Sequence, residues 1–163
     1  MDTGGVFRNG SFYLKDGSSF SYGLTGDKPV TGNWTGDRTT EVGVFRDGLF
    51  FLRNSTGGTE WFEYGRAGDY PIAGDWDGDG LSEVGVFRDG VFYLRASNGT
   101  TYDAFGWGLT GDSPIAGDWN GDRKTEVGVF RDGSFYLRAP DGSTYSAFGY
   151  GLTGDTPIAG KWI

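Results

Sequence analysis

The feature that most constrains the fold of this chain is an internal repeat. A Gly-Asp-x-Pro marker occurs four times, and its prolines are Pro29, Pro71, Pro114 and Pro157. The steps between these prolines are 42, 43 and 43 residues. The segments 85–119 and 128–162 are identical at 27 of 35 aligned positions. Copies this close must fold alike, so we expect an array of four equivalent units.

Each unit is predicted to contain four short strands and no helix. In the third unit the strands are expected near 114–119, 126–131, 135–138 and 144–150. Asp132-Gly133 separates two apolar runs, which is the strongest short-range signal for a two-residue hairpin turn. The same place in the other units holds Asn9-Gly10, Asp47-Gly48 and Asp89-Gly90.

The hairpin register assigns side chains to the two faces of the sheet. With a two-residue turn, Phe130 pairs with Phe135 and Val129 pairs with Tyr136. Because side chains alternate along a strand, Phe130, Phe135 and Leu137 share one face, and Val129 and Tyr136 share the other. Both faces are apolar, so each sheet must be stacked between neighbours. Four strands per unit at this period predict an all-β fold, a β-propeller of four four-stranded blades.

The repeat boundaries predict how the ring closes. We treat 1–163 as one propeller domain whose units, counted from the second strand, are 5–42, 43–84, 85–127 and 128–163. The first unit then lacks its first strand, and 157–162 is a spare first strand. Pairing 157–162 with the first blade (5–28) would close the ring and remove exposed edges. A piece of a longer propeller and a domain-swapped ring of two chains are the alternatives.

Composition excludes several classes of function. The chain has no cysteine and no histidine, which excludes disulfides, thiolate metal sites and Ser-His or Cys-His triads. The net charge of −8 argues against nucleic acid as a partner. No apolar run approaches the length of a membrane helix, and the N-terminus is not a signal peptide. We expect no catalysis, because near-identical repeats do not offer one asymmetric site with a raised pKa.

A loop in the second unit carries a candidate metal site. Counting from Asp75, acidic residues occupy positions 1, 3, 5 and 9, and Gly80 occupies position 6. Calcium prefers six to eight hard oxygen ligands, and alternate acidic residues in a tight loop point inward together. The backbone carbonyl at position 7 could add an oxygen. The predicted calcium ligands are Asp75, Asp77, Asp79, Leu81 and Glu83.

The equivalent loops of the other units depart from this pattern. The third unit has the set Asp118, Asn120, Asp122, Lys124 and Glu126, with Arg123 in place of the glycine. The first unit has Asn33, Thr35, Asp37 and Glu41, with Arg38 at position 6. The alternative to calcium is that these loops are Asx turns held by Arg–Asp pairs. We favour calcium in the second and third loops and the alternative in the first.

The second-unit loop resembles a known repeat family. The run Gly74-Asp75-Trp76-Asp77-Gly78-Asp79-Gly80, followed by Glu83-Val84-Gly85-Val86, is similar to FG-GAP/VCBS repeats. That family includes the propeller of integrin α subunits, fungal propeller lectins and many bacterial surface and secreted proteins. The resemblance implies β-propeller blades with calcium held in the loop between the first two strands. The family's functions are diverse, so it implies the fold more strongly than an activity.

Three sets of repeated side chains are candidate ligand sites. Each fourth strand ends in an aromatic residue: Tyr22, Tyr64, Trp107 and Tyr150. These rings could stack on sugars, or they could cover the outer edge of each blade. The arginines at the ends of the second strands could hold an anion: Arg8, Arg46, Arg88 and Arg131. We favour instead that each arginine pairs with a nearby carboxylate, such as the repeated Asp27, Asp69, Asp112 and Asp155. The tryptophans at the loop entrances could be sugar platforms, but we favour a place in the core for them: Trp34, Trp76, Trp119 and Trp162.

The sequence thus predicts a non-catalytic, calcium-stabilised recognition module. Carbohydrate is the preferred ligand, with lectin-like binding or adhesion at a cell surface or outside the cell. A glycan or a surface protein is the expected partner, with no membrane insertion and a monomer favoured over a swapped dimer. The alternative is a structural or protein-interaction scaffold, designed or cut from a larger exported protein.

Overall fold

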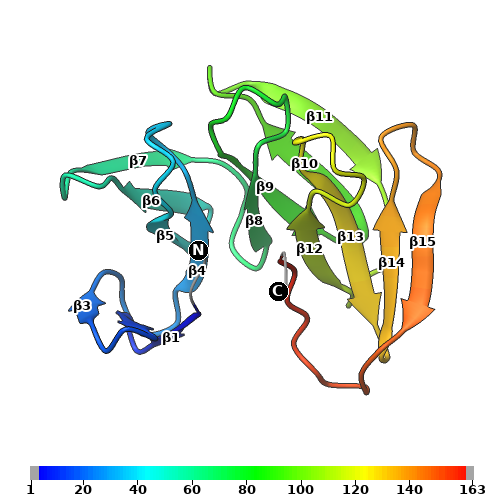
Figure 1. Ribbon diagram of the computed structural model, residues 1–163, viewed down its shortest axis with the longest axis horizontal. Helices are drawn as coiled ribbons and strands as arrows, with labels where there is room; N and C mark the ends of the chain where they lie inside the picture. The colour runs from blue at the N-terminus through cyan, green and yellow to red at the C-terminus, as the bar shows by residue number, and fades with distance from the viewer. Residues whose placement is uncertain (1–3, 161–163) are drawn as a thin grey trace.

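The computed structural model describes residues 4–160, and these residues form fifteen strands and no helix (Figure 1). Accordingly, no helix among them is long and apolar enough to cross a membrane. The strands are β1 (Gly5–Arg8), β2 (Ser11–Leu14), β3 (Ser19–Ser21), β4 (Lys28–Gly32), β5 (Glu41–Arg46), β6 (Leu49–Arg53), β7 (Thr59–Glu63), β8 (Tyr70–Gly74), β9 (Glu83–Arg88), β10 (Val91–Arg95), β11 (Thr101–Gly106), β12 (Ser113–Gly117), β13 (Glu126–Arg131), β14 (Ser134–Arg138) and β15 (Thr144–Gly149).

The strands form four antiparallel sheets that follow one another around a common centre as the blades of a four-bladed β-propeller (Figure 1). Blade 1 is β1–β3, blade 2 is β4–β7, blade 3 is β8–β11 and blade 4 is β12–β15. Every pairing joins strands that are neighbours in the sequence. The all-β fold and the division into four repeated blades are therefore confirmed.

The hairpin between the second and third strands of each unit has the predicted register. In blade 4, Phe130 pairs with Phe135 and Val129 pairs with Tyr136. Asp132 and Gly133 both have positive φ, 49° and 81°, as a type I′ turn requires. A Cβ atom on Gly133 would lie 2.5 Å from the Gly151 carbonyl oxygen, so this position has no room for another residue.

The core lies between the blades rather than within any one of them. One face of blade 2 carries Phe45, Phe50 and Phe62, and it packs against Val86 and Tyr93 of blade 3. Blade 3 presents its own phenylalanines to Val129 and Tyr136 of blade 4 in the same way. We call these two surfaces the phenylalanine face and the valine face of a blade. Stacking of phenylalanine faces on valine faces is what the two-sided apolar pattern predicted.

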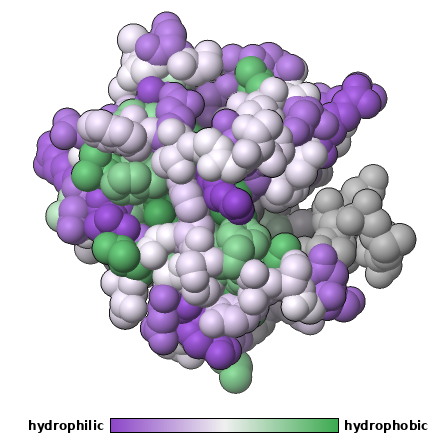
Figure 2. Space-filling view, turned by 90° about the vertical axis from the view of Figure 1, so that its left-hand side faces the viewer, coloured by the Kyte–Doolittle hydropathy of each residue, from purple (hydrophilic) through white to green (hydrophobic). Residues whose placement is uncertain are grey.

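Apolar residues also reach the surface. On the side of the molecule that faces left in Figure 1, they gather between hydrophilic residues in patches of limited extent (Figure 2). Trp61 and Leu24 are among the exposed large side chains of the first two blades. Scattered apolar exposure of this kind is ordinary for a folded domain.

The predicted closing strand is absent from the described part of the chain. Blade 1 has three strands, and β1 pairs only with β2. Residues 157–160 form no strand, and Lys161 and Trp162 of the expected strand lie outside the described residues. Four four-stranded blades closed by 157–162 were expected; among residues 4–160 the structure has three such blades and one of three strands. Residues 157–160 instead line a hollow against blade 4.

Candidate metal centre

The loop between β8 and β9 is organised around the side chain of Asp75. The backbone N–H of Gly78 donates to Oδ1 of Asp75 at 2.6 Å, and the N–H of Gly80 donates to Oδ2 at 2.9 Å. Gly80 has φ 91°, which glycine adopts easily. These bonds fold the loop into a tight turn. Carboxylate oxygens of Asp75, Asp77 and Glu83 lie within 4.8 Å of one another as a result.

Glu83 is the unusual member of this group. Only 6% of its surface is exposed. Its Oε2 accepts a hydrogen bond from the backbone N–H of Trp76 at 3.2 Å, whereas Oε1 is buried without any partner among the described residues. Burial raises the pKa of Glu83 to about 7; the Trp76 bond opposes this rise, and the negative charges of Asp77, Asp79 and Asp75 add to it.

A bound cation would account for two features of this site, the clustered carboxylates and the unpaired Oε1 of Glu83. Three clustered carboxylates repel one another, and a buried oxygen without a partner is costly. A divalent cation bound by hard oxygens would neutralise the charge and would occupy the free lone pairs of Oε1. The residues present therefore fit a calcium ion. Asp79, also predicted as a ligand, lies outside the group, and its Oδ1 accepts the Leu81 N–H at 2.8 Å.

The third-unit loop gathers a similar but partly satisfied group. Oxygens of Asp118, Asp122 and Glu126 lie within 4.8 Å of one another. Here the Asn120 amide donates to Glu126 Oε1 at 2.9 Å and to Asp122 Oδ2 at 3.1 Å. Burial raises the pKa of Glu126, against a hydrogen bond from Trp119, and the charges of Asp122 and Asp118 raise it further. Asn120 thus supplies in part what a cation would supply, with its Nδ2 facing the carboxylates.

The first-unit loop satisfies its glutamate with protein groups alone. Glu41 Oε1 accepts bonds from the Thr35 hydroxyl and from the backbone N–H of Ser55. Glu41 Oε2 accepts the Trp34 and Thr35 N–H groups. The Ser55 hydroxyl also binds Asp37, at 2.8 Å. No acidic group able to hold a metal forms at this loop among the described residues. The N–H of Gly36 donates to Asn33 Oδ1 and the N–H of Thr39 donates to Asp37 Oδ1, as the Asx-turn alternative expects, but no Arg–Asp pair holds this loop among residues 4–160.

Neighbouring loops are tied to one another across the blades. The backbone N–H of Thr125 donates to the Asp75 carbonyl at 2.8 Å, and the Asp75 N–H donates to the Thr125 hydroxyl at 3.0 Å. The side chain of Lys124 packs over Gly78 of the preceding loop. Any change in the shape of the second loop therefore acts directly on the contact between blades 3 and 4.

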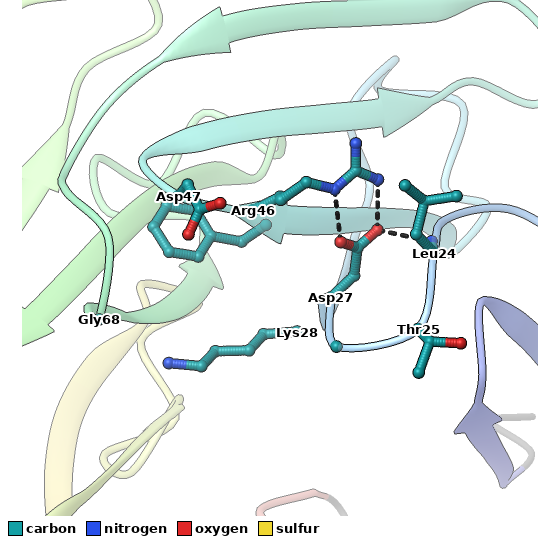
Figure 3. Close-up of a pocket in the computed structure, with 9 residues that line it drawn as sticks. Leu24, Thr25, Asp27, Lys28, Arg46, Asp47 and Gly68 are labelled. Atoms are coloured by element: carbon teal, nitrogen blue, oxygen red, sulfur yellow. Dashed lines mark hydrogen bonds and ion pairs between the residues drawn. The ribbon is translucent and has the colours of Figure 1, made fainter.

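Three of the four repeated arginines pair with a repeated aspartate 19 residues earlier, as predicted, whereas Arg8 and Asp155 form no such pair among residues 4–160. In blade 2, Arg46 Nε and Nη2 donate to Asp27 Oδ1 and Oδ2 at 2.6 and 2.7 Å (Figure 3). The Leu24 N–H also donates to Asp27 Oδ2. Arg88–Asp69 and Arg131–Asp112 repeat this geometry. The pair lies in a hollow of about 310 Å³ that Lys28 borders, and the anion site considered for the arginines is already filled by these carboxylates.

Three of the four proposed sugar-stacking residues are packed between blades. Tyr64 lies against the cluster joining blades 2 and 3, and its hydroxyl approaches the Thr101 hydroxyl at 3.4 Å. The Trp107 indole donates to the Tyr136 carbonyl at 3.2 Å. Tyr22 contacts Thr59 in the same manner. Tyr150 alone stands in solvent, 80% exposed.

The loop tryptophans behave as core residues where the structure describes them. Trp76 is buried, and its indole donates to the Val84 carbonyl at 3.3 Å. Trp34 and Trp119 are half-buried with equivalent bonds to Val42 and Val127. Trp162 lies outside the described residues.

Sequence reasoning missed the role of Ser55. This residue belongs to the turn after β6; its backbone N–H donates to Glu41 and its hydroxyl donates to Asp37 of the first loop. The only hint in the sequence was the place of Ser55, two residues after Arg53 in the turn that follows the third strand of the unit. Strand alternation and turn rules assign no function to a residue in that turn.

A scan against protein-family models matches no family, and a search of the curated proteins finds no similar sequence. The resemblance to FG-GAP/VCBS repeats therefore stays a prediction.

Proposed function

We propose that this chain is a non-catalytic recognition module whose propeller is stabilised by calcium. The observation that carries the proposal is the buried Oε1 of Glu83, which has no partner among residues 4–160 and shares its loop with Asp75 and Asp77. A carboxylate in that position costs free energy in the absence of a cation. Asp75, Asp77 and Glu83 would hold the ion, and the Leu81 carbonyl and Asp79 would complete its oxygen shell.

The ion would supply charge neutralisation and loop rigidity rather than chemistry. A ligand that binds only the folded state adds stability by mass action, about 2.7 kcal/mol when its concentration is a hundred times its Kd. In a chain of this size that corresponds to a rise in melting temperature of about 5–10 °C. Because the loop is bonded to Thr125, this stabilisation would extend to blade 4.

Thermal unfolding with and without calcium tests the proposal. We expect calcium to raise the melting temperature of chelator-treated protein, and magnesium to raise it less, since magnesium requires a stricter octahedral shell. Asp77→Asn should remove most of the calcium response. Asp37→Asn, at a loop already satisfied by Ser55, is the matched control and should keep the response. Equal melting temperatures in calcium and in chelator would contradict calcium stabilisation.

For the ligand, we propose carbohydrate as the first class to test and a protein-interaction scaffold as the alternative. Carbohydrate is supported by the resemblance to propeller lectins. The packing of Tyr22, Tyr64 and Trp107 between blades leaves little ring surface for stacking, which favours the scaffold. A glycan array probed in calcium separates the two: selective binding to related sugars supports the lectin function, and no binding by folded protein supports the scaffold. A calcium requirement would suit an extracellular or cell-surface setting.

A further inference from the structure

We propose that this chain binds a second copy of itself head to tail, with the phenylalanine face of blade 4 of one copy against the valine face of blade 1 of the other. The proposal goes beyond the proposed function and does not depend on calcium. It rests on four features of the contacts between successive blades, which we call the internal junctions. At the outer faces of blade 1 and blade 4, the two ends of the blade series, each feature has only one of its two partners.

The first feature is apolar packing. Val44, Val86 and Val129, the central residues of three valine faces, are each 1% exposed. The phenylalanine faces of blades 2 and 3 cover Val86 and Val129. Their counterpart in blade 1, Val6, is 57% exposed. The neighbouring Tyr13, which corresponds to Tyr93 and Tyr136, is exposed as well.

The matching phenylalanine face is formed on blade 4 and is covered only in part: Phe130 and Leu137 are buried, whereas Phe148 is 46% exposed. Its ring centroids lie 4.8 Å apart for Phe130–Phe135 and 5.2 Å apart for Phe135–Phe148, close to the spacings in the covered blades. Phe148 and Tyr150 are exposed, whereas their counterparts Phe105 and Trp107 pack against blade 4. The face borders an open hollow of about 670 Å³. Residues 156–160 line the same hollow, so a valine face would take their place there while the rings keep their spacing.

The second feature is charge. Three arginines each hold an aspartate 19 residues earlier in the chain, in bidentate pairs. By the repeat, Arg8 and Asp155 are the remaining halves of a fourth pair, and both are exposed. Asp155 is already oriented, because its Oδ2 accepts the Leu152 N–H at 2.9 Å, as Asp27 accepts that of Leu24. Among residues 4–160 neither Arg8 nor Asp155 forms such an ion pair.

The third feature is a cation over an aromatic ring. At each internal junction an arginine of the later blade lies over a phenylalanine of the earlier one: Arg53 over Phe20 at 4.9 Å, Arg95 over Phe62 at 3.8 Å and Arg138 over Phe105 at 3.9 Å. Lys15 holds the corresponding position in blade 1, and Phe148 is the ring that remains. A Lys15 ammonium from a second copy would complete the series.

The fourth feature is a free strand edge. The strands equivalent to β1 pair on both sides, β5 with β4 and β6 for example, but among residues 4–160 β1 pairs only with β2. Residues 157–160 correspond to the missing first strand, yet they lie against blade 4 unpaired. Joining these to the β1 of the same copy would require the described structure to move. The two ends of one copy do not cover each other, since Val6 and Phe148 are both exposed. A second copy can meet both ends with the blades as they stand, displacing only residues 156–160 from the hollow, and that is why we assign the partner to a second copy.

The contact is heterologous, since two different surfaces meet. Two copies could form a closed ring in which blade 4 of each copy contacts blade 1 of the other. Alternatively, further copies could add at either end. In both cases each copy offers one acceptor end, with Val6 and Arg8, and one donor end, with Tyr150 and Asp155.

The test measures mass against concentration by analytical ultracentrifugation, using wild type, Val6→Asp and Tyr150→Asp. We expect the wild type to associate as its concentration rises. Each variant alone should be monomeric, and an equimolar mixture of the two should form one-to-one complexes through the one intact pair of ends. Both substitutions are at exposed positions, so unchanged melting temperatures of the monomers serve as the folding check. Leu109→Asp, at an equally exposed position away from both ends, is the matched control and should associate like the wild type.

A charge exchange tests the specific pairing. Arg8→Asp and Asp155→Arg should each weaken association about ten- to hundredfold, and the protein carrying both changes should recover it. Lys15→Ala should weaken association about threefold, and Lys15→Arg should not. A wild type that stays monomeric at every concentration overturns the proposal, whether or not Val6 is protected from solvent. Association that survives both Val6→Asp and Tyr150→Asp overturns it too.

Discussion

Arg88 holds Asp69 through two parallel hydrogen bonds, 2.7 Å from Nε to Oδ1 and 2.6 Å from Nη2 to Oδ2. The Asp69 side chain is only 2% exposed. Asp69 Oδ2 also accepts the Arg66 N–H, so the same carboxylate shapes the connection between blades 2 and 3. The pair thereby joins the entrance of β8 to the end of β9.

Removing the charge of Asp69 should therefore be costly. We expect Asp69→Asn to lower the free energy of unfolding by about 3 kcal/mol, because it leaves the arginine facing a neutral partner in a largely desolvated site. Urea denaturation in calcium measures the change. Asp155→Asn in dilute, monomeric protein is the control, since Asp155 has the same loop bond but no arginine, and it should cost well under 1 kcal/mol. Equal losses for the two variants would show that the ion pair contributes little.

The Asp27 pair predicts a loss of stability in acid. Burial raises the pKa of Asp27, but the hydrogen bonds from Arg46 and Leu24 and the charge of Arg46 outweigh it, so the pKa lies below its ordinary value. A depressed carboxyl pKa contributes stability above the pKa of the unfolded chain, and this contribution is lost as the pH falls through the folded-state pKa. We expect the difference in unfolding free energy between wild type and Asp27→Asn to be constant near neutrality and to shrink below about pH 4. A difference that does not change down to about pH 2 would contradict this assignment.

Glu83 predicts the opposite dependence in metal-free protein. Its pKa is raised to about 7, so the folded chain binds this proton more tightly than the unfolded chain does. Stability should then be greatest below the unfolded-state pKa, about 4.3, and should fall by up to about 3 kcal/mol as the pH rises to about 7. Melting curves in metal-free buffer across this range provide the measurement. Glu83→Gln should flatten the dependence, and calcium should restore the stability of the wild type at high pH; a slope that Glu83→Gln leaves unchanged would assign it to another group.

The two ends of the blade series predict unequal costs for equivalent truncations. Phe50 is fully buried between blades 2 and 3, and Phe50→Ala should cost about 3–5 kcal/mol. Phe135 occupies the same position in blade 4 but is only half-buried, so Phe135→Ala should cost clearly less in dilute protein. Denaturant unfolding of the two variants compares them directly. Equal costs would mean that the blade 4 face is covered in solution even when the protein is dilute.

The blade architecture could be predicted because it depends on short-range rules. Asn-Gly and Asp-Gly turns set the hairpin register, and a period of two residues assigns each side chain to a face. Both rules operate within about twenty residues of Gly133, and the observed pairing of Phe130 with Phe135 follows from them. The repeat then extended one correct blade to the others. The acidic groups of the second and third loops could be predicted for the same reason, because each group comes from nine consecutive residues.

The three loop glutamates show where prediction from sequence ended. Glu41, Glu83 and Glu126 occupy the same position in their repeats. The sequence set the first loop apart by its fewer carboxylates and by Arg38, but it named no hydrogen-bond partner for any of the three glutamates. Their hydrogen bonds differ: Ser55 and Thr35 satisfy Glu41, Asn120 satisfies Glu126, and Oε1 of Glu83 has no partner. Whether a glutamate oxygen finds a hydrogen-bond partner depends on residues of other turns, such as Ser55, and on how deeply the oxygen is buried. A local sequence pattern predicts neither of these.

The sequence by itself determined the strands, their turns, the stacking of blades and the identity of the acidic loops, because turn geometry and side-chain alternation are properties of neighbouring residues. Only the tertiary structure decided which surfaces are covered. It placed Tyr64 and Trp107 between blades, and it left Val6 and Tyr150 in solvent at the two ends of the series. Similar repeats differ in this respect because exclusion of water requires a neighbouring blade, and within residues 4–160 the outer faces of the first and last blades have none.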